Sequence, residues 1–276
     1  YLIRQYISYA IYLEKLANFK QLKIAIVDYD HLCPKGLIFA LKKKKIKIVS
    51  TQERYVGGLF KSFYNVIADT YFTCSDYMNE KIKNSKYFQV KNPISVGQYR
   101  VDYLEKYYKN NIPEEILIQK SKGKKVIVAL GLSLSDCPNF DPKFDIAVNW
   151  NAQKNFINDM LKLSKDIKNS YLIFRFRSFV WKNVPFFQSC LKKIDENPNV
   201  SIASDYSEFF ISYKYCANAD LIIAKRTSLA DECLAFGKKL IFYDYTHNLN
   251  KIISDLPEYI PERSSSLNNF DIYCHN

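Results

Sequence analysis

The sequence after residue 125 alternates between short apolar runs and amphipathic stretches, and this alternation limits the folds open to the chain. The apolar runs are continuous, as in strands that are buried on both faces of a sheet. The stretches between them have helical spacing. We predict strands at 125–131, 171–177, 200–204, 220–224 and 239–243, and helices at 153–168, 184–194, 207–217 and 227–236. This order predicts a doubly wound parallel α/β sheet.

The first part of the chain has a shorter version of the same pattern. Its apolar runs predict strands, and residues 1–19 have the spacing of an amphipathic helix. Residues 113–124 contain a proline, a glycine and mixed charge, so we predict a linker there. The predicted strands are 22–28, 46–50 and 70–74, and the predicted domains are two Rossmann-like lobes at 1–112 and 125–276. Because the chain opens at Tyr1 with few strands, we expect the first lobe to be incomplete.

The net charge of +12 comes mainly from lysine, since the chain has 33 lysines and 7 arginines. Two interpretations stay open: a solvated lysine surface, or attraction to anionic partners such as nucleotides and acidic lipid headgroups. The seven cysteines have no repeated spacing and no CxxC pair, which predicts free thiols in a reducing compartment. No apolar run approaches the roughly 18 residues of a membrane-spanning helix. We therefore expect a cytoplasmic protein.

Candidate site residues lie where the predicted strands end, because ligands of open α/β sheets bind at the carboxyl ends of the strands. Five of the seven arginines lie at or beyond such ends, and the planar guanidinium can hold two phosphate oxygens at once. The alternative for Arg175 and Arg177 is an exposed edge strand with both side chains solvated. The candidates in chain order are His31, Glu53, Arg100, Ser133, Arg175, Arg177, Lys225, Arg226, Thr227, Ser228, Glu232 and His247.

The segment 224–248 is the most specific stretch of the sequence. After a predicted strand come two cations, and then Thr227 and Ser228 open a helix. Free N–H groups at a helix start, with hydroxyls and cations beside them, suit a diphosphate. Glu232 follows one turn later and has the chemistry to accept hydrogen bonds from a ribose diol. The alternative, compatible with the first, is that Thr227 or Ser228 only caps the helix.

Three segments resemble the GT-B glycosyltransferases and the related CDP-glycerol glycerophosphotransferases. TSLADECLAFGKKLIFYDY (227–245) is similar to the signature of their C-terminal lobe, and VGQYRVDYL (96–104) to the Gly-x-x-Arg-x-Asp element that closes their N-terminal lobe. DTYFTCSDYMNEKI (69–82) resembles the strand-Ser-helix step before that element. The resemblance implies a GT-B fold with the acceptor side in lobe 1–112 and the nucleotide donor in lobe 125–276.

The sequence also departs from the phosphotransferases. They have a His-Gly in the N-terminal lobe and a His-Pro after the second strand of the C-terminal lobe, where this chain reads TQERYVGG (51–58) and RFRSF (175–179). Arg175 or Arg177 would then bind phosphate in place of the histidine. We therefore expect transfer of a sugar from a nucleotide-activated donor to a surface-polysaccharide or lipid-linked acceptor, rather than transfer of glycerol phosphate.

The acceptor hydroxyl in such a transfer needs a general base within hydrogen-bond reach. Glu53 is the first candidate because it follows a strand; the alternative is a surface carboxylate paired with Arg54. His31 is the second candidate, since its ordinary pKa lies near neutrality. His247 follows the last predicted strand, and a contact with donor or acceptor is expected there.

No cofactor is expected. The sequence has no GxGxxG after a first strand, no GxxxxGK[ST] loop and no metal-ligand cluster. The expected partners are a nucleotide-sugar donor, a carbohydrate or lipid-linked acceptor, and an acidic membrane face for peripheral contact; nucleic acid is not expected. Two other functions stay open: a nucleotide-sugar epimerase of the same fold, and a non-catalytic module that binds nucleotides or nucleic acid.

Overall fold

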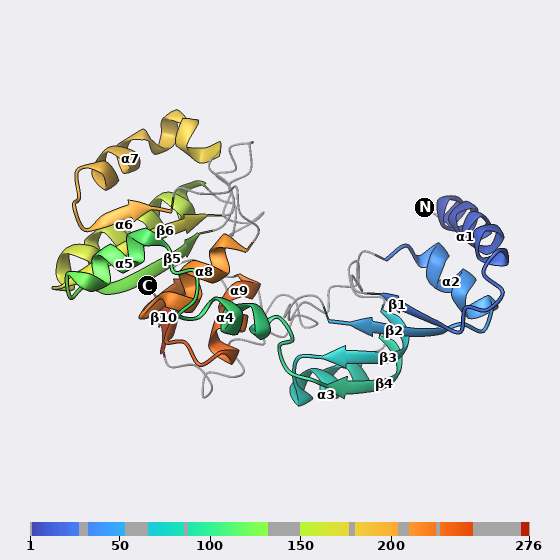
Figure 1. Cartoon of the computed structure of the whole chain (residues 1–276). Helices are drawn as coiled ribbons and strands as arrows, with labels where there is room; N and C mark the ends of the chain where they lie inside the picture. The colour runs from blue at the N-terminus through green and yellow to red at the C-terminus, as the bar shows by residue number, and fades with distance from the viewer. Residues whose placement is uncertain are drawn as a thin grey trace. The chain divides into compact units, whose positions relative to one another are not determined.

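The computed structural model describes residues 2–27, 33–52, 66–85, 88–131, 150–176, 180–203, 210–224, 227–244 and 272–275, and the structural statements below refer to these residues. The chain divides into two compact units (Figure 1). Of the described residues, those up to Tyr99 form the first unit and those from Arg100 onward form the second. Each unit has its own parallel sheet flanked by helices, which confirms the predicted α/β class.

The first unit is built on a four-stranded sheet whose spatial order, β1-β2-β3-β4, follows the chain. All neighbouring strands are parallel. The apolar residues between the sheet and its helices form one core that includes Ile48, Tyr71 and Met78. The elements are α1 (Leu2–Ala17), β1 (Ile24–Val27), α2 (Lys35–Lys43), β2 (Lys47–Thr51), β3 (Ile67–Thr73), α3 (Asp76–Lys83) and β4 (Gln89–Ser95).

The second unit has six parallel strands in the order β10-β9-β8-β5-β6-β7. The chain starts at β5 in the middle, adds two strands on one side and then three on the other. The strand order therefore reverses between β5 and β8, as in doubly wound sheets. The strands are β5 (Lys125–Gly131), β6 (Ser170–Phe176), β7 (Val200–Ile202), β8 (Leu221–Ala224), β9 (Leu240–Asp244) and β10 (Ile272–His275).

Helices cover both faces of this sheet. Alternate residues of β5 belong to two separate cores, with Val126 and Val128 in one and Ile127 and Ala129 in the other. This is why the strands have continuous apolar runs rather than alternating ones. The first core includes residues of α4 (Val101–Tyr107), α5 (Glu114–Ser121), α8 (Ile211–Asn218) and α9 (Ser228–Ala235), and the second includes residues of α6 (Trp150–Asp166), α7 (Gln188–Asp195) and the 3-10 turns Val180–Asn183 and Pro185–Phe187.

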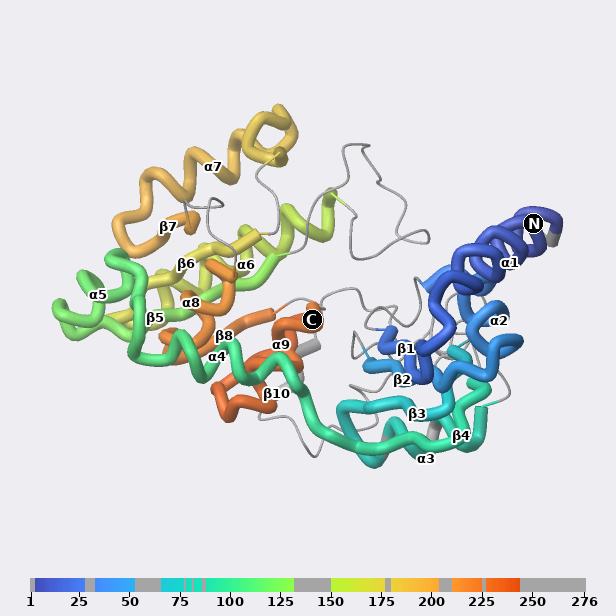
Figure 2. Tube along the Cα trace, turned by 45° about the vertical axis from the view of Figure 1, so that its right-hand side comes forward, coloured from blue at the N-terminus to red at the C-terminus, as the bar shows by residue number. Residues whose placement is uncertain are grey.

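The stretch predicted as a linker, 113–124, contains α5, and Ile116 of this helix is fully buried in the core of the second unit. The preceding residues 101–112, predicted as part of the first lobe, also lie in the second unit. There α4 packs against α8 and α9, as Figure 2 shows. The weak periodicity of 113–124 has a physical reason, since Ile116 is the one residue of α5 that is buried.

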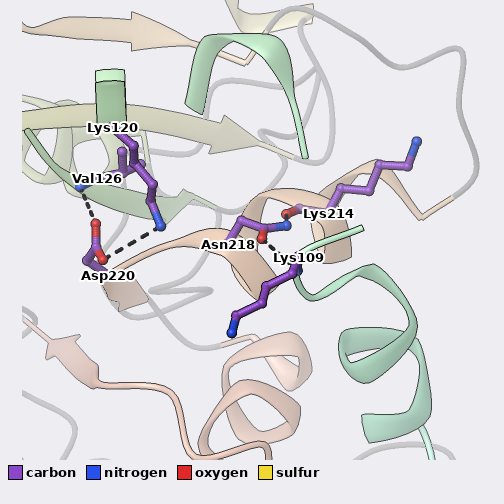
Figure 3. Close-up of polar contacts among 6 residues, drawn as sticks. All are labelled: Lys109, Lys120, Val126, Lys214, Asn218 and Asp220. Atoms are coloured by element: carbon purple, nitrogen blue, oxygen red, sulfur yellow. Dashed lines mark hydrogen bonds and ion pairs between the residues drawn. The ribbon is translucent and has the colours of Figure 1, made fainter. Parts of the chain in front are cut away.

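Two polar residues, the buried Asn218 at the end of α8 and the half-buried Asp220 just after it, fix this arrangement (Figure 3). The Oδ1 atom of Asn218 accepts a hydrogen bond from the N–H of Lys109 at 3.1 Å, and its Nδ2 donates to the carbonyl oxygens of Tyr107 at 3.0 Å and Lys214 at 2.9 Å. Asp220 accepts a hydrogen bond from the N–H of Val126 at 2.8 Å. The Asn218 side chain thus joins the end of α4 to α8. The Asp220 side chain joins the residue before β8 to the start of β5.

Two strands were not predicted. The strand β4 contains Pro93 and few apolar residues, and none of its residues at this sheet edge is fully buried. The strand β10 is a four-residue edge strand near the end of the chain. Neither forms the apolar run that marks a buried strand. The predicted free thiols are confirmed for the described cysteines Cys33, Cys74, Cys190, Cys216 and Cys233. No helix within the described ranges has the length and apolar character needed to cross a membrane.

Candidate functional site

The candidate site lies at the carboxyl edge of the second sheet, where the strand order reverses. There β5 ends at Gly131 and β8 ends at Ala224, and α9 begins at Ser228 shortly after β8. Thr227 is the N-cap residue, with an extended backbone and no side-chain hydrogen bond that caps the helix. The predicted placement of Thr227 and Ser228 at a helix start is therefore confirmed, whereas the capping role is not seen for the Thr227 side chain.

Gly131 allows the end of β5 to lie close to the Phe176 ring at the end of β6. It pairs in register with Phe176, the last residue of β6. A Cβ atom on residue 131 would lie 2.1 Å from the Phe176 ring, which is itself almost completely buried. The close approach explains why the last residue of β5 has no side chain.

Arg175 is held by two hydrogen bonds at the carboxyl end of β6. Its Nε donates to Oγ of Ser212 at 3.0 Å, and a terminal nitrogen donates to the carbonyl oxygen of Phe176 at 2.7 Å. The residue is only 5% exposed, and β6 lies between β5 and β7. The alternative of a solvated Arg175 on an exposed edge strand is therefore excluded. A charged group this deeply buried needs hydrogen-bond partners, and Ser212 is one of them.

Glu232 is buried in α9 and bound to Tyr213 of α8. The carboxylate is 3% exposed, and its Oε2 accepts a hydrogen bond from the Tyr213 hydroxyl at 2.5 Å. Burial raises the pKa of Tyr213 strongly, and the neighbouring Glu232 carboxylate raises it further. Tyr213 therefore stays protonated and donates its hydrogen bond over the whole physiological range. The positive charge of Arg100 acts on Tyr213 in the opposite direction and lowers its pKa.

An aromatic cluster positions the start of α8. Phe210 precedes the helix with a left-handed backbone (φ 67°) and stacks on Tyr103 of α4, with ring centroids 4.3 Å apart. Tyr213 contacts both rings, at 5.5 Å from Tyr103 and 5.7 Å from Phe210. Arg100 lies at the N-terminal end of α4, three residues before Tyr103. The packing of α4 on α8 thus brings Arg100 within electrostatic reach of Tyr213.

The first turn of α8 binds two of the predicted site residues that the structure describes. Adjacent residues, Ser212 and Tyr213, bind Arg175 and Glu232 respectively. Neither Ser212 nor Tyr213 was predicted. The available signal was weak: a polar residue and a tyrosine at the start of a predicted helix, with no pattern that sets them apart. The predicted residues His31, Glu53, Ser133, Arg177, Lys225, Arg226 and His247 lie outside the described residues.

A metal-binding role has no support in the described part of the chain, where no three His, Cys, Asp or Glu side chains form a group that could hold a metal ion. The buried carboxylate of Glu232, the buried guanidinium of Arg175 and the start of α9 are instead the polar groups that the described residues place near this edge of the sheet. Such a set can bind a ligand that has both hydroxyl groups and negative charge.

No protein family and no curated protein sequence matches this chain. Solved structures do match its fold. It is similar to MnaA of S. aureus in complex with UDP, at 11% identity and a TM-score of 0.61, over 86% of this chain and 62% of that one. It is similar to a UDP-N-acetylglucosamine 2-epimerase at 12% identity and a TM-score of 0.64, over 98% and 64% of the two chains. A glycosyltransferase from Rickettsia africae matches at 15% identity and a TM-score of 0.50, over 95% and 76%.

These likenesses show that the chain has an α/β fold of the GT-B type, with two Rossmann-like units. The predicted fold class is therefore confirmed. The chain spans less than two thirds of the length of the S. aureus protein and of the epimerase.

Proposed function

We propose that this chain binds a nucleotide-sugar at the carboxyl edge of its second sheet and transfers the sugar to a carbohydrate or lipid-linked acceptor. The observation that supports this most is the pairing of Arg175 and Glu232 with adjacent residues of α8. Both side chains are buried, and they lie at the sheet edge where doubly wound folds bind nucleotides. The similarity in fold to a UDP complex agrees with the proposal.

The proposed roles follow from the chemistry of the side chains. Arg175 supplies a fixed positive charge for a diphosphate, and the N–H groups at the start of α9 supply hydrogen-bond donors beside Thr227 and Ser228. Glu232 accepts hydrogen bonds from the ribose hydroxyls, since an ionised carboxylate has two acceptor oxygens and no donor. Three further residues remain proposed phosphate contacts. They are Arg177, which follows β6 in the sequence, and Lys225 and Arg226, which follow β8.

In the proposed transfer, the acceptor hydroxyl oxygen bonds to the anomeric carbon while the bond from that carbon to the diphosphate oxygen breaks. The leaving diphosphate gains negative charge, which Arg175 and the helix start stabilise. The acceptor hydroxyl loses its proton to a general base, for which Glu53 and His31 remain the proposed residues. Ser133, Arg100 and His247 remain proposed contacts around the ligand.

The test is a calorimetric titration with UDP, GDP, CDP, CMP and their sugar conjugates. We expect one nucleotide to bind, and Arg175→Lys and Glu232→Gln to weaken its binding by about tenfold or more, because each loses a charge-assisted hydrogen bond. Lys193→Gln, on the exposed face of α7, is the control with unchanged affinity. Equal affinity in all four proteins would exclude the proposed site.

A nucleotide-sugar epimerase is the second candidate, because one of the similar structures is a UDP-N-acetylglucosamine 2-epimerase and another is a complex with UDP. Product analysis separates the two reactions. A transferase releases nucleoside diphosphate only when an acceptor is present, whereas an epimerase inverts a sugar carbon with no acceptor. Binding of nucleic acid with steep salt dependence, and none of nucleotide-sugars, would instead indicate a non-catalytic module.

A further inference from the structure

Three lysines lie together at the amino edge of the second sheet, the edge opposite the candidate site. Lys120 is in the last turn of α5, which leads into β5, and Lys238 follows α9, which leads into β9. Lys109 follows α4, whose end is bound to Asn218 just before β8. We call Lys109, Lys120 and Lys238 the lysine cluster.

The ammonium groups of Lys109 and Lys238 both lie near the aromatic ring of Tyr108. The Nζ atom of Lys109 lies 5.2 Å from the ring centroid, and that of Lys238 lies 5.1 Å from it. Both distances are within the range of cation–π attraction. The ring is 42% exposed, so this group of side chains is open to solvent.

The positive charges of the lysine cluster exceed the negative charge beside them. Lys120 lies 3.7 Å from Oδ1 of Asp220, and the other oxygen of Asp220 accepts the N–H of Val126 (Figure 3). Partial burial lowers the pKa of Lys238, and the charge of Lys120 lowers it further. Among the described residues, Asp220 is the carboxylate that raises the pKa of Lys238. One carboxylate therefore acts on the ammonium groups of Lys120 and Lys238, and Lys109 adds a third positive charge at the Tyr108 ring.

The backbone around the lysine cluster is held in place. Asn218 is almost completely buried and accepts a hydrogen bond from the N–H of Lys109 (Figure 3). It also donates to the carbonyl oxygen of Tyr107. Lys109 itself has a left-handed backbone, with φ 57°. A ligand at this place would therefore meet a preformed backbone, which lowers the entropic cost of binding.

The three helix ends favour one lysine each, but they do not remove the repulsion among the three ammonium groups. The partial negative charge at a helix C-terminus favours one cation, and α4, α5 and α9 all end here. The three lysine cations repel one another, and a dianion with several acceptor oxygens would reduce that repulsion. We propose that Tyr108 and the lysine cluster form a second binding site, for a phosphate group.

The test is an NMR titration of the whole chain with inorganic phosphate at low salt. We expect saturable shifts at Tyr108 and Lys109, and affinity about tenfold weaker in Lys238→Gln, since one charge-assisted hydrogen bond is lost. Lys165→Gln, which removes an exposed lysine from the last turn of α6, is the matched control and should bind as the wild type does. If tryptophan fluorescence shows that Lys238→Gln is unfolded, Lys109→Gln replaces it, because Lys109 is exposed.

Vesicles distinguish a free phosphate from a lipid headgroup. Phosphatidic acid vesicles that retain the wild type but not Lys238→Gln, with phosphatidylcholine vesicles retaining neither, would indicate a headgroup. Phosphate shifts without retention on vesicles would indicate a free anion. The proposal is overturned if neither probe binds, or if Lys238→Gln, Lys109→Gln and Lys165→Gln all bind as the wild type does. It does not depend on the proposed reaction, because the candidate nucleotide site lies at the other edge of the sheet.

Discussion

The hydroxyl group of Tyr213 donates a 2.5 Å hydrogen bond to the buried carboxylate of Glu232 and thereby joins α8 to α9 behind the candidate site. The preceding residue, Ser212, accepts a hydrogen bond from Arg175 of β6. Two neighbouring residues in one helical turn thus determine where the buried anion and the buried cation lie. A change in the position of α8 would move both charges together.

Tyr213→Phe removes this hydrogen bond and leaves the carboxylate of Glu232 buried without it. We expect the free energy of unfolding of the second unit to fall by about 1.5–3 kcal/mol, as for a hydrogen bond to a charged group. Tryptophan fluorescence in urea measures this unit alone, because Trp150 and Trp181 are the two tryptophans of the chain and both lie in it. Tyr6→Phe, at a tyrosine that is 72% exposed, should leave the transition unchanged. An equal stability of Tyr213→Phe and wild type would contradict the geometry.

Asn218→Ala removes two hydrogen bonds that join the end of α4 to α8 and a third within α8. We expect a loss of about 2–4 kcal/mol in the second unit, because the N–H of Lys109 and two carbonyl groups lose a buried partner. The same fluorescence transition measures the loss. Asn110→Ala is the control, since the side chain of Asn110 is exposed and makes only a long 3.4 Å bond to Lys106. Hydrogen exchange at Lys109 should accelerate in Asn218→Ala and stay unchanged in the control.

Gly131→Ala places a methyl group against the Phe176 ring. We expect a destabilisation of about 1–3 kcal/mol from overpacking. Phe176→Leu makes room, so adding the methyl group should cost less in that background. The urea midpoints of the two single variants and the double variant give this coupling directly. A cost that is the same in both backgrounds would mean that the strand ends do not meet as described.

Asp69 makes the stability of the first unit depend on acid pH. The hydrogen bond from Lys91 at 2.7 Å lowers the pKa of Asp69 below its ordinary 3.8, and so does the bond from the N–H of Ile48 at 2.9 Å. The unfolded chain therefore binds the proton at higher pH than the folded one. The stabilisation is complete above the ordinary pKa and is lost as the pH falls through the lowered one.

The acid dependence can be measured by hydrogen exchange of the Ile48 amide between neutral pH and pH 2. Protection of this amide should fall below the ordinary pKa of Asp69 in the wild type. In Asp69→Asn that decrease should be absent. A decrease of the same size in both proteins would assign it to other carboxylates.

Among the described strands, the sequence predicted all those that lie inside a sheet and also the edge strands β1 and β7, but it missed the edge strands β4 and β10. Ile127, Val128 and Ala129 must all be apolar because helices cover both faces of β5, and this leaves a run that can be read without a structure. A strand such as β4 is covered less, so its composition resembles that of a loop. The same reasoning applies to α5, where burial of Ile116 alone leaves no periodicity to detect.

For the candidate site, the sequence determined which residue types follow which strand, and so placed Arg175, Thr227, Ser228 and Glu232 at one sheet edge. It did not identify Ser212 and Tyr213, or the approach of Arg100 to Tyr213. The Tyr213–Glu232 hydrogen bond joins residues 19 positions apart, and the Arg175–Ser212 bond joins residues 37 positions apart. Arg100 is further still from Tyr213 in the sequence. These contacts depend on the packing of α4, α8 and α9. Periodicity reports whether a residue is buried, whereas the choice of hydrogen-bond partner depends on which helices meet, and only the tertiary structure decides that.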